Sequence, residues 1–437
     1  MSTDDPTSKH NGTTASFSLI VARIFYGVNW FNVSAVFPLI ALDFNQDLSL
    51  LGSISAAFFI GVGLFQIPAG IFAAKYSPRT AAILGIGVSS TAAILSGFAT
   101  DPAHLIILRF VVGLGMAFFF SSGMILIARY AKQKSPGFSI GIMNSAHSVG
   151  GIVGMFAWII IAQVVGWRPS LMLSGGIGLA TALMMILTIP SSKSGKDGNS
   201  HLQQESAVHQ ELMPSPPNIL KTLTNSQLIS IGLVLTGIQA AWALVLTFIV
   251  VYLQDLGIPL EIIGVIASLP LISAIVSAPL IGRIYDRIMR DATRILLICG
   301  AGISASMIGL ASMSLPVMIA SVIVIGIFSG GAFTVAYARA RAVSITEITK
   351  KEESFTDIQK ETKNNDQRSS GDKATDSPDY ATLNVAWVNG LSLIGVLWMP
   401  IAFSIVVKNT GGFQTAWILA ALLTAFFVTI PLYKVGK

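Results

Sequence analysis

Long apolar stretches, separated by short polar segments, run along almost the whole chain. A helix that spans a lipid bilayer needs about 20 mostly apolar residues. Twelve stretches meet this requirement: 17–42, 48–74, 80–99, 103–130, 138–165, 169–190, 227–253, 259–284, 293–313, 316–341, 381–407 and 412–433. The pattern therefore predicts an all-α integral membrane protein with twelve transmembrane helices.

Two longer polar segments interrupt this pattern. Residues 191–226 separate six apolar stretches from the next six, and residues 344–380 are rich in Lys, Glu, Asp, Asn and Ser, too polar to bury a core. We expect both to be cytoplasmic and largely without fixed structure, and leave open a helical start to the second. The expected division is a cytoplasmic tail at 1–16, a six-helix bundle at 17–190, a linker at 191–226, a second six-helix bundle at 227–433 that carries the insert 344–380, and a tail at 434–437.

The two halves of the chain repeat one another. A shift of 212 positions places Trp30 on Trp242 and Asp43 on Asp255, and it also superimposes Leu48 on Leu260, Gly52 on Gly264 and Gly70 on Gly282. Beyond the insert the shift becomes 245 and superimposes Asn144 on Asn389, Gly150 on Gly395 and Gly166 on Gly411. The repeat predicts two pseudo-symmetric six-helix bundles, with a substrate site at their interface near the bilayer midplane.

Charge is scarce and unevenly placed. Hydrophobic residues make up 53% of the chain and charged residues 11%, with a net charge of +6. If the N-terminus is cytoplasmic, 23 of the 27 Lys and Arg residues fall on the cytoplasmic side, which is the bias expected of an inserted membrane protein. We therefore expect a multi-pass protein of the plasma membrane with both termini cytoplasmic. The basic residues then orient the chain in the lipid bilayer, and no nucleic-acid partner is expected.

The residue inventory argues against an enzyme. Cys299 is the single cysteine and lies in an apolar run, so no disulfide or thiolate metal cluster can form. The sequence shows no nucleophile–base pair and no nucleotide-binding loop. We expect no metal and no cofactor.

Short motifs resemble the major facilitator superfamily. In this family, a signature of Gly, three residues, Asp and a basic residue lies between the second and third helices of each half. The second half has it intact as Gly282-Arg-Ile-Tyr-Asp286-Arg287, whereas the first half has Ala74 at the acidic position. The segment Arg109-Phe-Val-Val-Gly113-Leu-Gly115 resembles the family's fourth helix. The resemblance implies a monomeric secondary transporter that works by alternating access. It also implies a cytoplasmic gate that includes Gly70, Lys75, Arg79, Gly282, Asp286 and Arg287.

One branch of the family can be compared directly. The segment Asn32-Val-Ser-Ala-Val-Phe-Pro38 resembles the first helix of the organic-anion and organophosphate branch. Members of that branch usually carry an anion-binding arginine two residues before this asparagine, and here that position is Trp30, with Trp242 as its repeat mate. The paired arginines are therefore missing, which makes strongly anionic substrates a less favoured expectation.

Several polar and aromatic residues fall on helices that line the cavity in this family. The candidate cavity residues are Tyr26, Trp30, Gln66, Asn144, His147, Gln239, Trp242, Trp387 and Asn389. No Asp or Glu lies in the middle of a predicted span, so the candidate coupling residues are Arg23, Arg109 and His147. Two of these have structural alternatives: Arg23 near the membrane edge could extend to the lipid headgroups, and His147 could be a neutral, hydrogen-bonded packing residue.

These observations predict a secondary active transporter of a small organic solute, with protons as a candidate coupling ion. The first choice of substrate is a neutral, zwitterionic or weakly acidic metabolite with an apolar or aromatic part. The alternative is an organic anion or phosphorylated metabolite, attracted by Arg23, Arg109 and His147. A different class, a non-transporting receptor or sensor on the same fold that signals through residues 344–380, also remains open.

Overall fold

The first half of the chain folds into a bundle of helices. The computed structural model describes residues 6–45, 48–130, 136–190, 219–289, 291–362 and 380–435 of the chain. The helices of the first half are α1 (Pro6–Phe44), α2 (Leu48–Lys75), α3 (Pro78–Ser96), α4 (Pro102–Tyr130), α5 (Pro136–Ile152), the π-helix η1 (Val153–Ala157), α6 (Trp158–Val165) and α7 (Trp167–Thr188). The elements α5, η1 and α6 follow one another without a break and together form the fifth span.

The second half forms a matching bundle. Its elements are the short helix α9 (Ile219–Leu223), then α10 (Ser226–Asp255), α11 (Leu260–Arg287), α12 (Ala292–Leu310), α13 (Leu315–Thr362), α14 (Tyr380–Thr410) and α15 (Phe413–Val435). In the described residues, eleven helical segments are long and apolar enough to cross a membrane, and Phe413–Thr429 is a shorter apolar helix. This agrees with the predicted twelve-helix all-α membrane fold.

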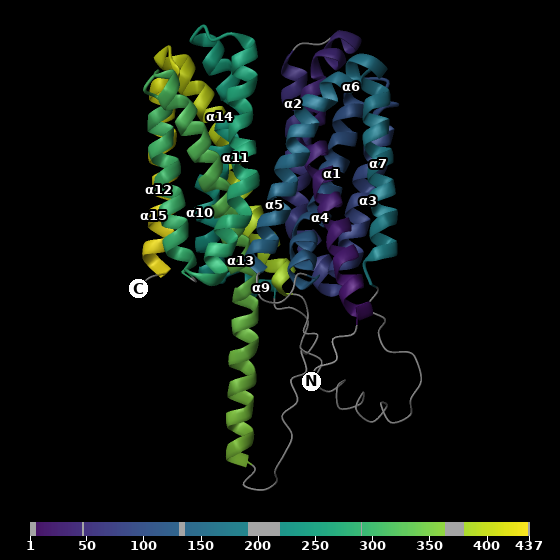
Figure 1. The fold of residues 1–437 in the computed structure, drawn as a ribbon, viewed down its shortest axis with the longest axis vertical. Helices are drawn as coiled ribbons and strands as arrows, with labels where there is room; N and C mark the ends of the chain where they lie inside the picture. Colours follow the sequence, from purple (N-terminus) through teal and green to yellow (C-terminus); the bar gives the residue numbers. More distant parts are fainter. Residues whose placement is uncertain are drawn as a thin grey trace.

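Two element boundaries differ from the prediction. The first helix already begins at Pro6, within the segment expected to be a tail. The tenth span continues as one helix to Thr362, so the first half of the 344–380 insert is helical and extends beyond the bundle (Figure 1). A helix grows cheaply once a preceding turn exists, which explains why polar residues can extend an apolar span. The expectation for 191–218 and 363–379 lies outside the described residues.

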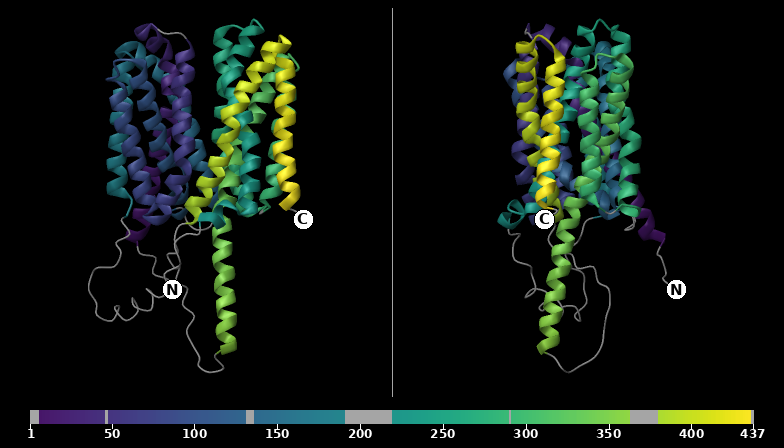
Figure 2. Two further views of the ribbon diagram at one scale, coloured as in Figure 1. Left: turned by 180° about the vertical axis from the view of Figure 1, so that it is seen from behind. Right: turned by 90° about the vertical axis from the view of Figure 1, so that its left-hand side faces the viewer.

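The two bundles lie side by side, and the helices of each pack mainly on one another (Figures 1 and 2). Between the bundles, α5 packs on α11, and α2 packs on α14. These are the second helix of each bundle against the fifth helix of the other. The inter-bundle contacts therefore follow the pseudo-symmetry that the sequence repeat predicts.

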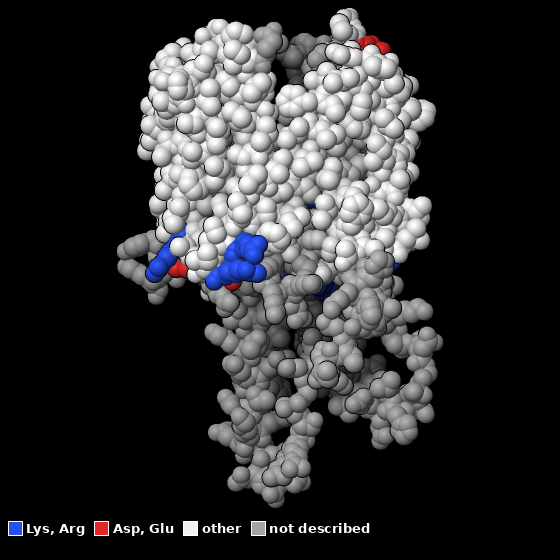
Figure 3. Space-filling view, in the orientation of Figure 1, with Lys and Arg blue, Asp and Glu red and all other residues white. Residues whose placement is uncertain are grey.

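Both ends of the described chain, and the extension of α13, lie at one end of the molecule, which we call the tail end (Figure 2). In the space-filling view, Lys and Arg side chains gather along the tail end, the wall of the bundles is almost uncharged, and the surface is hollowed between the bundles at the opposite end (Figure 3). The bundles thus meet near the tail end.

Close backbone contact fixes α1 against α5. A Cβ atom added to Gly27 would lie 2.3 Å from the main-chain oxygen of His147, and one added to Gly150 would lie 2.0 Å from that of Ile24. Only glycine allows helices to approach so closely in a membrane bundle. This contact holds the backbone around His147 beside the middle of α1, where the candidate site residues of that helix lie.

Candidate functional site

Arg23 is buried in the first bundle, with 4% of its surface exposed. Its guanidinium carbon lies 4.3 Å from the ring centroid of Tyr26 and 4.9 Å from that of Phe120, both cation–π distances. Its Nε donates to the main-chain oxygen of Met143 at 3.4 Å. The expectation that Arg23 could extend to the headgroups is wrong, because α5 and the aromatic side chains enclose it.

The charge of Arg23 is incompletely compensated. Its Nη1 is buried without a hydrogen-bond partner, and within the described part of the chain no carboxylate lies within ion-pair distance. A buried cation is normally paired, because removing a charge from water is costly. The positive charge of Arg23 is therefore available to attract an anion.

His147 adjoins this arginine across an aromatic cluster. Its ring centroid lies 5.5 Å from that of Tyr26, 5.8 Å from that of Trp30 and 6.1 Å from that of Phe31. The side chain is half-buried and its Nδ1 has no hydrogen-bond partner. Asn144, one turn before His147 on the same helix, does not bond to it, since the amide of Asn144 donates across the bundle interface to Thr334.

Two further polar residues of the first bundle are fully enclosed. The Nη2 of Arg109 donates to the main-chain oxygen of Asn29 at 2.8 Å, and its Nε and Nη1 have no partner. Gln66 donates to Ser121 Oγ at 3.0 Å, and its Oε1 is buried without a partner. Arg109 thus packs inside the first bundle against α1, with Phe58 at 5.4 Å from its guanidinium carbon.

In the second bundle, a chain of hydrogen bonds joins α10, α13 and α14. Tyr337 Oη donates to Asn389 Oδ1 at 2.8 Å. Ser392 Oγ lies 2.8 Å from Gln239 Oε1 and 2.7 Å from the main-chain oxygen of Asn389. Tyr337 and Ser392 were not expected from the sequence, although Ser392 lies one turn after Asn389, a spacing that places both on one helix face. Trp242 and Trp387 are half-buried on the same helices.

The interface between the bundles is closed by polar contacts near the tail end. Asp286 on α11 accepts hydrogen bonds from the main-chain nitrogens of Gly137 at 3.1 Å and Phe138 at 2.9 Å. These are first-turn donors of α5, which have no partner within their own helix. Deeper along the interface, Asn144 Nδ2 donates to Thr334 Oγ1 at 3.0 Å. The carboxylate therefore caps a helix of the opposite bundle.

A second contact completes a backbone defect in α11. Pro279 lacks an N–H group, so it cannot donate to the main-chain oxygen of Ile275 one turn earlier. Ser145 Oγ on α5 lies 2.5 Å from this oxygen and donates to it across the interface. The sequence alone did not point to Ser145. Each bundle thus supplies a side chain that satisfies an unpaired backbone group of the other.

Of the remaining predicted gate residues, the two glycines lie at the interface between the bundles, and the three basic residues lie away from it. Gly70 faces Leu383 and Ala386 of α14, and a Cβ atom added to Gly282 would lie 2.3 Å from the main-chain oxygen of Gly137. Arg79, in contrast, donates to the main-chain oxygens of Ile189 at 2.8 Å and Ile186 at 2.9 Å, both at the end of α7 in its own bundle. Lys75 and Arg287 are exposed at the ends of their helices.

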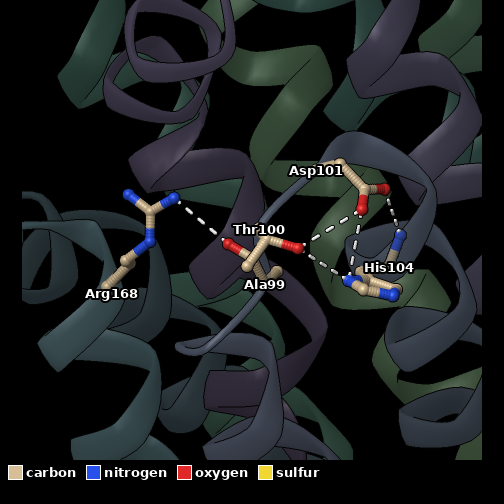
Figure 4. Close-up of polar contacts among 5 residues, drawn as sticks. All are labelled: Ala99, Thr100, Asp101, His104 and Arg168. Carbon is tan, nitrogen blue, oxygen red and sulfur yellow. Dashed lines mark hydrogen bonds and ion pairs between the residues drawn. The ribbon is translucent and has the colours of Figure 1, made fainter.

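At the opposite end, a polar cluster ties the first bundle together. Arg168 pairs with Asp43 at 2.5 Å and donates to the main-chain oxygen of Ala99 at 3.1 Å. Beside it, Asp101 Oδ1 accepts the main-chain N–H of His104 at 3.0 Å, and this bond holds the pKa of Asp101 below its ordinary value (Figure 4). The cluster links α1, the α3–α4 turn and α7 into one unit.

The described residues contain no group of three or more His, Cys, Asp or Glu side chains that could hold a metal ion. In the described part of the chain, apolar helices in two pseudo-symmetric bundles enclose polar side chains within and between the bundles, an arrangement typical of secondary transporters. The sequence model of the Major Facilitator Superfamily matches residues 19–344. The chain belongs to this superfamily.

The chain is also similar to individual transporters. It is 25% identical over 295 residues to the probable sulfoacetate transporter SauU of Cupriavidus necator, with 65% of this chain and 68% of that protein covered. It is 25% identical over 310 residues to the D-galactonate transporter of Escherichia coli, covering 66% and 72%. The crystal structure of the transporter FucP in the outward conformation shares the fold, with a TM-score of 0.64, 14% identity, and coverage of 95% and 98%.

Proposed function

We propose that this secondary transporter carries a small organic acid anion by alternating access. The observation that supports the proposal is the environment of Arg23, a buried cation with an unpaired nitrogen and no carboxylate partner in the described chain. The proposal thereby keeps the acidic substrates of both sequence-based choices and disfavours the neutral and zwitterionic ones. The names of the two similar transporters, sulfoacetate and D-galactonate, are those of small organic acids and agree with this preference.

An anion at Arg23 would gain more than a neutral solute. The guanidinium group offers planar donors that match a carboxylate or sulfonate. A charge-assisted hydrogen bond in an enclosed site is about twice as strong as a neutral one. The aromatic side chains around Arg23 and His147 exclude water from the contact and offer flat surfaces to an apolar part of the substrate.

Orientation follows from the positions of the basic residues. We place the tail end in the cytoplasm, since the positive-inside bias assigns Lys and Arg to that side, and we place the protein in the plasma membrane as a monomer. The bundles meet at the tail end, so this conformation is outward-facing. A substrate would then enter from the hollow at the opposite end.

Coupling to protons is part of the proposal and assigns the titrating role to His147. Two histidines lie in the described spans: His104 is exposed in the first turn of Pro102–Tyr130, and His147 lies deeper, in the middle of the fifth span. The Nδ1 of His147 is unpaired, and Arg23 lies close by. A bound anion between them would favour the protonated histidine, because an opposite charge stabilises the charged form. Substrate and proton would then promote each other's binding.

We expect His147→Gln to lose pH-driven accumulation of substrate in proteoliposomes while exchange without a gradient persists. Accumulation of substrate by this variant would exclude the proton-coupling role of His147.

The experiment for the substrate class compares acids with their neutral analogues. Benzoate against benzamide, and propionate against propionamide, are tested as inhibitors of uptake by proteoliposomes and as ligands that raise the melting temperature. We expect only the acids to act, and Arg23→Gln to reduce their affinity at least 10-fold. Arg23→Lys should recover part of it, and Arg294→Gln, at an exposed position in the first turn of α12 and outside the predicted gate, serves as the matched control. Equal effects of acids and amides on the wild-type protein would refute the anion proposal.

The sensor alternative is favoured by one observation, the continuation of α13 to Thr362 beyond the membrane-spanning part. The same proteoliposomes distinguish the two functions. A transporter accumulates or exchanges labelled solute, whereas a sensor binds it and moves none.

A further inference from the structure

The hydrogen-bonded side chains of the second bundle form a surface that continues directly from Arg23. Phe120 packs against Arg23 on one side, at 4.9 Å, and against the ring of Tyr337 on the other, with 5.2 Å between ring centroids. Tyr337 then donates to Asn389, whose neighbour Ser392 contacts Gln239. A cationic and aromatic wall from the first bundle thus meets an amide-bearing wall from the second.

In this row of hydrogen bonds, the side-chain amides of Asn389 and Gln239 each use only one of their two polar atoms. Asn389 uses its Oδ1 and Gln239 uses its Oε1, and neither amide nitrogen has a hydrogen-bond partner within the described part of the chain. If either amide were rotated by 180°, its oxygen would be the unused atom instead. In each orientation, one polar atom of each residue remains available. Asn389 is 5% exposed and Gln239 is half-buried, so both amides are only partly open to water.

A polar atom that has no partner in the protein and is only partly open to water favours a ligand that supplies one. A hydroxyl group suits both amide orientations, since it can donate and accept. A carboxylate would suit only the nitrogen, and an apolar group neither atom. We therefore propose that Asn389 and Gln239 recognise hydroxyl groups of the substrate, so that the protein selects hydroxylated organic acids over the same acids without hydroxyl groups.

The inference rests on the proposed anion transport and specifies its substrate class. The acid group is held from the first bundle by Arg23, and the hydroxyl-bearing part is held from the second bundle. Tyr337 and Ser392 act as positioning residues, because they orient the two amides. A ligand bound in this way contacts both bundles, which is what a substrate must do to stabilise an occluded state between the two open ones.

The test uses acids that differ only in hydroxylation. Isothermal titration calorimetry of the full-length protein in nanodiscs compares 4-hydroxybenzoate with benzoate, and glycerate with propionate. We expect the hydroxylated acid of at least one pair to bind 10-fold to 100-fold more tightly. Sites that pair with a substrate hydroxyl reject the analogue that lacks it by large factors.

Variants locate the preference. Asn389→Leu and Gln239→Leu, which replace each amide by an apolar side chain of similar size, should bring the affinity ratio within each pair to about twofold while the affinity for the unhydroxylated acid stays within threefold. Tyr337→Phe, which removes a single oxygen, should lower the ratio in part and guards against misfolding of the other two. Asn384→Leu is the matched control on α14, because its amide bonds to the main-chain oxygen of Ala340 instead.

The outcomes separate the two proposals. If the acids bind and depend on Arg23 but neither pair shows a preference above twofold, the inference is overturned and the anion transport stands. A preference that survives both leucine variants would also overturn it. If none of the four acids binds the wild-type protein, both proposals fail.

Discussion

Removal of the Asp286 carboxylate should shift the protein away from the conformation described here. In this state the carboxylate accepts two main-chain N–H groups of α5, at 3.1 Å and 2.9 Å. When the bundles separate at the tail end, the carboxylate and the helix end both become hydrated. Asp286→Ala therefore destabilises the closed tail end and leaves the open one largely unchanged.

The size of the shift follows from these two bonds. A hydrogen bond to a charged group contributes about 1.5–3 kcal/mol when buried, and the helix dipole adds to the attraction. Asp286 is only half-buried, and water replaces part of the loss when the interface opens. We expect a net change of about 1–3 kcal/mol, which corresponds to a population ratio changed about 5-fold to 150-fold.

The assay measures the distance between the bundles at the tail end. Spin labels at Tyr76 and Ile288, which are 63% and 80% exposed, report it in a Cys299→Ala background. We expect Asp286→Ala to enlarge the long-distance population and to slow transport. Asp291→Ala is the matched control, because Asp291 caps its own helix α12 by accepting from Arg294.

Two outcomes bear directly on the reasoning. Unchanged distance distributions in Asp286→Ala would show that these hydrogen bonds do not hold the bundles together. The repeat mate Ala74 lacks a carboxylate, so Ala74→Asp should leave transport nearly unchanged or add a second contact with α14. A strong opening of the tail end by Ala74→Asp would contradict the pseudo-symmetric explanation.

Three further predictions concern other contacts. Ser145→Ala should also open the tail end, by about 1 kcal/mol, but much less in a Pro279→Ala background, where the helix regains its own donor; equal effects in both backgrounds would exclude the proposed complementation. The lowered pKa of Asp101 means that its ionised form stabilises the folded state above the ordinary value of 3.8, and this contribution is lost as the pH falls through the folded pKa. Asp101→Asn should therefore flatten the acid branch of a melting-temperature profile, and an unchanged branch would count against it. In intact cells, an impermeant thiol reagent should label Leu42→Cys from outside and leave Tyr76→Cys unlabelled until the inner face is opened; the reverse pattern would invert the orientation.

The sequence by itself determined the architecture, because a membrane leaves the backbone few choices. A segment of about 20 apolar residues must satisfy its own hydrogen bonds in lipid, so it becomes a helix whatever its neighbours do. The repeat then related the two halves. The motif around Asp286 placed a carboxylate at the end of the second helix of the second half, and Ala74 at the matching position of the first half. All of this depends on local composition, on the spacing of residues within one helix and on the comparison of one half of the sequence with the other.

Only the tertiary structure decided which polar groups meet. The burial of Arg23 depends on Met143 and Phe120, and the amide of Asn144 bonds to Thr334, 190 residues away, instead of to His147 on its own helix. Such partners depend on how the helices are rotated and how closely they approach one another. The length of an apolar stretch in the sequence does not determine either. In a nearly uniform apolar chain, the rotation of each helix is set by small-residue contacts with its neighbours. The character of the site therefore emerges only when the two bundles pack.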